Sequence, residues 1–298
     1  MAYHVPVLLH ESIEGLEIKP NGTYVDLTFG GGGHSTEILK HLNKGRLIAF
    51  DQDEEALANA IDDKRFILIR SNFRFFRNFL RYHGIKEVDG ILADLGVSSH
   101  HFDSPERGFS FRFEGPLDMR MNQNQRLSAK QVINSYSSED IANVLIQYGE
   151  LQGARRLANA ICKARDERTI ETVEQLADLL KPMFPSATQN KMLAQVFQAI
   201  RIEVNQEMEV LKQMLTNATK ALKKDGRLVV IAYHSLEDRL VKNYFRSGNF
   251  EGDLDKDFYG NVTSPYEQIN RKVIVPSEEE NRQNSRARSA KLRIGRKQ

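Results

Sequence analysis

The strongest constraint on the fold is a run of four glycines, Gly30–Gly33, between a strand-like and a helix-like segment. Residues 23–27 are mostly apolar and favour a strand. The segment after Ser35 places its apolar residues on one helical face. Glycine allows a sharp turn and lets the backbone approach a ligand closely. Strand, tight turn and helix in this order predict the opening unit of a nucleotide-binding α/β domain.

Two carboxylates narrow the choice of ligand for this turn. A nicotinamide loop usually reads G-x-G-x-x-G directly after the strand and holds a pyrophosphate. Here Asp26 lies at the strand end, four residues before the first glycine, where we expect it to face a ligand without phosphates. Asp51 ends the next predicted strand and can accept both hydroxyls of a ribose. The glycines alone also fit an ordinary turn, but together with Asp26 and Asp51 they favour S-adenosylmethionine.

Strand-like and helix-like segments alternate over the first third of the chain. Strands are predicted at 23–27, 46–50, 65–70 and 90–94, and helices at 54–61 and after Asn72. This alternation predicts a parallel sheet covered on both faces, with the ligand beyond the carboxyl ends of the strands. Asp94 and Phe73 also follow strands there. Phe73 fits either an adenine-stacking residue or an ordinary core aromatic.

The alternation stops after Asp94. Residues 107–121 alternate phenylalanine with Ser and Arg, which fits either a half-buried strand or a stacking surface for nucleic acid built from Phe109, Phe111 and Arg112. Helical patterns follow, including one long helix predicted over 188–224. We therefore expect an all-α insertion at 123–204 within a methyltransferase domain formed by 1–122 and 205–298.

The C-terminal part returns to the sheet. A strand predicted at 227–233 ends in the string HSLEDR, which fits a helix cap with Ser235 and Asp238 or a group of catalytic side chains. Segments 272–276 and 290–294 predict a last pair of strands, antiparallel because no crossover helix fits between them. The basic residues after 281 form either a phosphate-contacting tail or a solvated one.

Composition narrows the class of protein. The 298 residues are 40% hydrophobic and 28% charged, and one cysteine excludes a multi-cysteine zinc site and an internal disulfide framework. The histidines lack ligand spacing, so no metal site is expected. No apolar run reaches the ~20 residues of a membrane span, and no signal peptide is evident. A cytoplasmic protein without a membrane partner is expected; a homodimer remains open.

Four sequence motifs resemble those of a known family. TFGGGGHS, DLGVSS, GPLDMRM and HSLEDR, in this order, closely resemble the RsmH (MraW) family over almost the whole chain. The resemblance implies a class I S-adenosylmethionine-dependent methyltransferase, Rossmann-like, with a mostly parallel sheet, a terminal antiparallel strand and an inserted all-α subdomain. It also implies methylation of the exocyclic 4-amino group of a cytidine in the decoding region of 16S rRNA in the small ribosomal subunit.

The resemblance also implies site residues. It assigns donor contacts to Gly32, Gly33, His34, Asp51, Phe73, Asp94 and His101, the last standing where many members have glutamine. Cytosine's amine is a poor nucleophile unless an oriented acceptor holds its protons. The candidates for that role are Asp94 or a neighbouring carbonyl, with Asp118, His234 or Asp238. Asp94 fits either this role or a donor contact alone. Arg120 and Arg239 fit either phosphate contacts or salt bridges.

Three other functions remain open from sequence. They are a methyltransferase acting on a small molecule or protein, a nicotinamide oxidoreductase, and a non-catalytic RNA-binding assembly factor that retains donor binding. The basic tail and the large insertion argue against the first of these, and Asp26 argues against the second. Site variants that still bind RNA and complement a deletion of the gene would favour the third.

Overall fold

The computed structural model describes residues 6–96, 104–254 and 263–298. The chain forms two compact units, one of residues 1–96 with 208–298 and one of residues 97–207. We call them the sheet unit and the helical unit. The helical unit includes residues 97–122, which the sequence analysis grouped with the methyltransferase domain.

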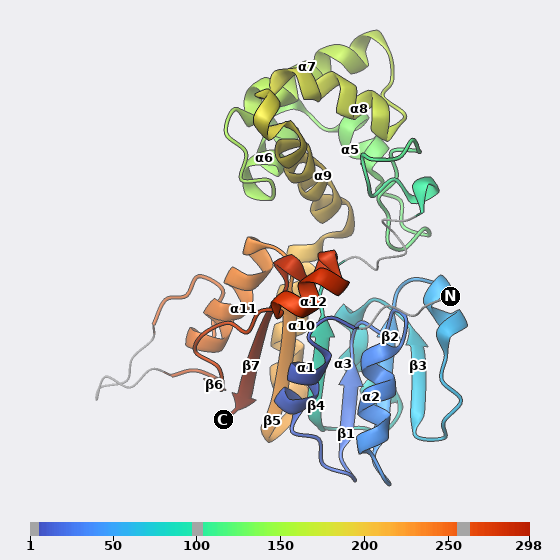
Figure 1. Ribbon diagram of the computed structural model, residues 1–298, viewed down its shortest axis with the longest axis vertical. Helices are drawn as coiled ribbons and strands as arrows, with labels where there is room; N and C mark the ends of the chain where they lie inside the picture. The colour runs from blue at the N-terminus through green and yellow to red at the C-terminus, as the bar shows by residue number, and fades with distance from the viewer. Residues whose placement is uncertain (1–5, 97–103, 255–262) are drawn as a thin grey trace. The chain divides into compact units, whose positions relative to one another are not determined.

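A seven-stranded sheet organises the sheet unit (Figure 1). Its strands are β1 (Thr23–Asp26), β2 (Arg46–Asp51), β3 (Phe66–Arg70), β4 (Val88–Asp94), β5 (Leu222–Ala232), β6 (Tyr266–Gln268) and β7 (Lys291–Lys297). They lie in the order β3-β2-β1-β4-β5-β7-β6. The first five pair in parallel, and β7 pairs antiparallel with β5 and β6. This order confirms the predicted class I methyltransferase fold.

Alternation along the strands supplies two apolar faces, each covered by helices. The helices of this unit are α1 (Leu9–Leu16), α2 (Gly33–His41), α3 (Phe76–Tyr82), α10 (Glu207–Ala221, whose first residue belongs to the helical unit), α11 (Ser235–Ser247) and α12 (Glu278–Gln283). On β1, Tyr24 packs in one core with α1 and α2, and its neighbour Val25 packs in the other with α3, α10 and α11. Both faces are therefore buried, as expected for parallel strands.

The helical unit has a hydrophobic core of its own. Its helices are α5 (Ala129–Ser135), α6 (Ser138–Gln147), α7 (Ala154–Glu167), α8 (Val173–Leu180) and α9 (Gln189–Asn205). The buried cluster that they share runs from Phe109 to Val204 and contains only residues of this unit. Ser128 and Thr172 cap α5 and α8 with reciprocal capping boxes.

The prediction of one long helix over 188–224 is wrong. This segment is divided into α9 and α10 at Gln206, which adopts the left-handed conformation with φ 51° and ψ 37°. Arg201 spans the division with a bidentate ion pair to Glu207, both N···O distances being 2.9 Å. A heptad-like apolar pattern continues through the division, because both helices bury one face, and so it conceals the break.

Three shorter predictions also fail. Residues 55–59 form a 3-10 helix instead of the α-helix predicted at 54–61. Residues 107–121 contain no strand, which removes the half-buried strand interpretation. The strand predicted at 272–276 is reduced to a single bridge from Ile274 to Leu292, and the edge strand is β6 instead.

None of the helices within the described ranges combines the length and apolarity needed to cross a membrane.

The backbone at Gln206 predicts a stability difference between two matched substitutions. A non-glycine residue in the left-handed region costs about 1 kcal/mol, which glycine avoids. Both Gln206→Gly and Gln206→Ala remove the side chain, but only glycine relieves the backbone. We expect the glycine variant to exceed the alanine variant by about 1 kcal/mol in the free energy of unfolding, measured by urea denaturation. Equal stability of the two variants would contradict this.

Candidate functional site

The glycine turn joins β1 to α2 in a conformation that requires glycine at two positions. Gly30 and Gly32 have φ of 51° and 75°, values that L-residues other than glycine rarely adopt. A Cβ on Gly30 would meet nothing within 4 Å, whereas a Cβ on Gly33 would lie 2.2 Å from Pro6 Cγ. The turn is therefore open at Gly30, while Gly33 admits the N-terminal segment of the chain.

Asp26 holds this turn from inside. Its side chain is buried, with Oδ2 accepting from Ser35 Oγ at 2.7 Å and Oδ1 accepting from the Thr28 amide at 3.0 Å. Burial raises the pKa of Asp26, and these hydrogen bonds oppose the shift. The sequence analysis expected Asp26 to face a ligand. The structure gives it an internal role between the end of β1 and the start of α2.

Asp51 connects the turn to the end of β2. Its Oδ2 accepts from the Gly30 amide at 2.8 Å, and its Oδ1 accepts from the Asp53 amide at 2.8 Å. Asp51 thus adjoins the open side of the glycine turn, as the sequence predicted.

Asp94 lies at the end of β4 with partners from three other elements. Its amide donates to Thr28 Oγ1 at 2.7 Å, and its Oδ1 accepts from the Tyr233 hydroxyl at 2.8 Å. His34 Nδ1 lies 3.9 Å from Oδ2, and the side chain of Asp94 is 23% exposed. The Asp94 carboxylate is therefore fixed through one oxygen and still borders solvent.

Burial changes the ionisation of this group. It raises the pKa of Asp94 to about 6, against the opposing effects of His34 and the Tyr233 hydroxyl. Burial also lowers the pKa of His34, whose Nε2 lies 3.1 Å from the Val7 carbonyl. Because a carbonyl only accepts, this contact assigns the ring proton to Nε2. At neutral pH the site therefore combines an ionised carboxylate with a neutral imidazole.

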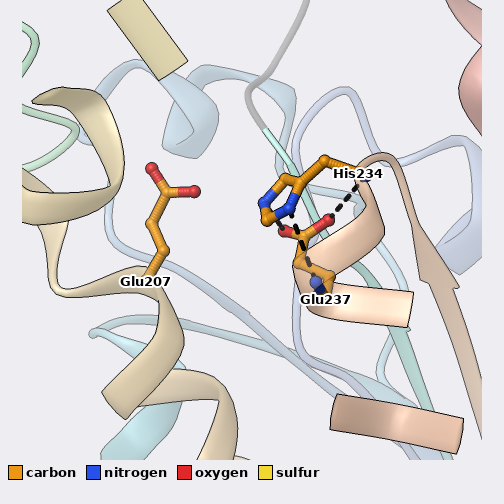
Figure 2. Close-up of side chains that lie close together, drawn as sticks. All are labelled: Glu207, His234 and Glu237. Atoms are coloured by element: carbon orange, nitrogen blue, oxygen red, sulfur yellow. Dashed lines mark hydrogen bonds and ion pairs between the residues drawn. The ribbon is translucent and has the colours of Figure 1, made fainter. Parts of the chain in front are cut away.

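His234 and Glu237 form the cap of α11 (Figure 2). His234 Nδ1 accepts from the Glu237 amide at 3.4 Å, and Glu237 Oε2 accepts from the amides of Tyr233 and His234 at 2.9 and 3.3 Å. The cap interpretation of HSLEDR thus holds, but one residue earlier than expected: His234 replaces Ser235, and Glu237 replaces Asp238. This gives His234 a structural task.

Asp238 is engaged by the last strand. Its Oδ1 accepts from Arg293 Nε at 2.6 Å, and its Oδ2 lies 3.5 Å from Lys291 Nζ. The side chains of Asp238 and Arg293 are 14% and 11% exposed. This ion pair fastens α11 to β7, and it accounts for both carboxylate oxygens without a substrate.

The predicted residues of the helical unit have mainly internal contacts. Asp118 and Arg120 form a bidentate pair with N···O distances of 2.8 and 2.7 Å, and Arg120 also donates to two backbone carbonyls. Phe109 is buried in the core, and Phe111 contacts Phe197 with ring centroids 5.4 Å apart. Arg112 is exposed. The salt-bridge interpretation of Arg120 is confirmed.

Three further predicted residues lie in different environments. Phe73 is half-buried at the start of the 3-10 helix that follows β3, and it packs against the core to which α3 contributes. Arg239 is exposed on α11. His101 lies outside the described residues, so its predicted donor contact stays a prediction.

Sequence reasoning missed Tyr233, Thr28 and Ser35. Tyr233 directly follows β5, and Gly96 admits its ring, because a Cβ on Gly96 would lie 2.9 Å from Tyr233 Cδ2. A signal was present, since a polar residue after β5 lies beside one after β4 in a parallel sheet. Thr28 and Ser35 flank the glycines and resemble ordinary turn and cap residues in sequence.

Comparison with known proteins decides the family. The model of the MraW methylase family matches residues 1–298. This chain belongs to the MraW methylase family. The MraW assignment confirms the resemblance carried by the four strings, and it makes the protein a methyltransferase.

Relatives of this MraW methylase align over nearly the full chain. Ribosomal RNA small subunit methyltransferase H of Bacteroides thetaiotaomicron is 58% identical over 298 residues, which cover 100% of this chain and 98% of that protein. The protein of the same name from Amoebophilus asiaticus is 54% identical and covers 98% of this chain and 95% of its own. Among solved structures, a putative methyltransferase from Streptococcus mutans in complex with SAH aligns over all of both chains, with a TM-score of 0.45 and 13% identity.

The raised pKa of Asp94 predicts a pH-dependent gain in stability for Asp94→Asn. The pKa of Asp94 in the folded protein, about 6, exceeds its ordinary value of 3.8. Ionised Asp94 therefore destabilises the fold above pH 6. Below pH 3.8 the carboxyl is protonated in both the folded and the unfolded protein, and the effect disappears. The gap of about two units corresponds to at most about 3 kcal/mol. We expect the free energy of unfolding of Asp94→Asn to exceed that of the wild type by about 1–3 kcal/mol at pH 7.5. This difference should decline as the pH falls from 6 to 4. Urea denaturation across pH 4–8 measures it; a pH-independent difference would contradict it.

Proposed function

We propose that this MraW methylase transfers a methyl group from S-adenosylmethionine to the exocyclic 4-amino group of a cytidine in the decoding region of 16S rRNA, in the small ribosomal subunit. The observation that carries the proposal is the pair of carboxylates, Asp51 and Asp94, beside the open glycine turn. The relatives named as small subunit rRNA methyltransferases, aligned over nearly the whole chain, support the choice of substrate.

The residues present fit this methyl donor. The Gly30 amide donates to Asp51, which places this carboxylate beside the turn for the two ribose hydroxyls, and Gly30 has no side chain to obstruct a ligand. Gly32, Gly33, His34 and Phe73 border the same edge of the sheet. Two carboxylates at one edge would repel a pyrophosphate, whereas S-adenosylmethionine has none and supplies an electrophilic methyl group on a sulfonium.

The protein must then act on the amine. Asp94, mostly ionised at neutral pH, accepts an N–H of the cytosine amine and so frees the nitrogen lone pair for attack. The nitrogen gains the new N–C bond as the C–S bond breaks, with the bonding electrons staying on sulfur. The displaced N–H proton passes to Asp94 and then to water. His234, Asp238 and Asp118, each engaged in the fold, act as structural residues.

RNA must present the base outside a stack. Extruding a base costs a few kcal/mol, and single-stranded RNA lowers that cost. Arg112 is exposed and suits a phosphate contact, whereas Arg120 is committed to Asp118. Arg239 is exposed as well, although it also has a partner within the protein. We assign RNA recognition to the helical unit and methyl transfer to the sheet unit, in a cytoplasmic enzyme.

The role of Asp51 predicts a loss of donor affinity. Asp51→Asn removes the charge that accepts the ribose hydroxyls, and charge-assisted hydrogen bonds contribute about tenfold each. We expect S-adenosylmethionine to bind about 10- to 100-fold more weakly, measured by calorimetry. Asp89→Asn is the matched control. Asp89 also accepts a hydrogen bond from a backbone amide, that of Thr23, but it lies at the start of β4, away from the edge where the strands end. Equal losses in the two variants would contradict the assignment.

The reaction is tested with labelled donor and small ribosomal subunits from cells lacking the gene. We expect methyl incorporation into 16S rRNA, and nuclease digestion with mass spectrometry should identify 4-methylcytidine. Donor binding without methyl transfer would instead favour an assembly factor. Methylation of another base position would overturn the assignment of the amine.

A further inference from the structure

Tyr233 contacts the reactive edge of the sheet without belonging to any recognised string. Its hydroxyl donates to Asp94 Oδ1 at 2.8 Å, and its amide donates to Glu237 Oε2 at 2.9 Å. Its ring lies against Gly96, where any larger residue would collide with it. Both ends of the residue are therefore fixed, so that the hydroxyl has a defined direction toward Asp94.

The surroundings of Asp94 explain why such a donor is needed. Burial is the main effect that favours the neutral form of Asp94, and the negative charges of Asp26 on β1 and Glu237 on α11 add to it. His34 on α2 offers only partial compensation, because its proton is on the far nitrogen and its Nδ1 is 3.9 Å away. The Tyr233 hydroxyl is the group at hydrogen-bond distance that favours the ionised form.

We propose that Tyr233 is a positioning residue for methyl transfer, which holds Asp94 through Oδ1 as an ionised acceptor and leaves Oδ2 for the substrate amine. This inference rests on the proposed function. A carboxyl that became protonated could not accept the amine N–H. Without the Tyr233 hydroxyl, the site would retain its shape, but the Asp94 carboxyl would be protonated over part of the physiological pH range and could not accept the amine N–H there.

The test is the pH profile of single-turnover methyl transfer by Tyr233→Phe. Losing a hydrogen bond to a charged group raises the pKa of Asp94 by about one unit. The wild-type rate should increase with pH around 6, and the variant rate around 7. The variant should be about fivefold slower at pH 6 and equal to wild type by pH 8.5. Tyr244→Phe is the matched control, since that hydroxyl contacts Thr219 instead, and its profile should match wild type.

A merely structural role for Tyr233 gives a different result. It would lower the rate by the same factor at every pH, and this outcome, like an unchanged profile, overturns the inference. Replacing Tyr233 by 3,5-difluorotyrosine keeps the ring and provides a stronger donor, so its profile should move below that of wild type; failure to move would also count against the inference. An inactive wild-type enzyme would refute the proposed function itself.

Discussion

The buried carboxylate of Asp26 is the interaction on which the arrangement of the site depends. It binds Ser35 on α2 and the amide of Thr28, and the Thr28 hydroxyl in turn accepts from the amide of Asp94. This chain of hydrogen bonds joins the ends of β1 and β4 to the start of α2. Because a buried charge without partners is strongly unfavourable, the geometry of the glycine turn and the position of Asp94 are determined together.

The titratable residues of the sheet unit fall into two groups according to their contacts. Asp238 binds Arg293 on β7, and His234 and Glu237 terminate the backbone of α11. These residues hold α11 against the sheet. Asp51 and Asp94 differ from them in position, since Asp51 adjoins the open glycine turn and Asp94 is 23% exposed where β4 ends. Titratable residues that the sequence groups as one candidate site thus lie in different environments, and their partners distinguish them.

Much of the sheet unit could be predicted from the sequence, because its signals are local. Apolar runs, glycines and terminal acids gave strands β1 to β4 and placed Asp51 and Asp94 at one edge. The failures have a common cause in interactions distant along the chain. The break at Gln206 has no proline or glycine to mark it, and the pairing of Tyr233 with Asp94 joins residues 139 positions apart. Periodicity carries no information about either.

The self-contained core of the helical unit has an evolutionary consequence. The buried cluster from Phe109 to Val204, and the partly buried apolar residues packed against it, all belong to this unit, as in an inserted domain. Substitutions within that core are accommodated inside the helical unit and do not involve the two cores that cover the strands. Under the proposed function, RNA contacts on the helical unit would change between lineages independently of the site at the strand ends.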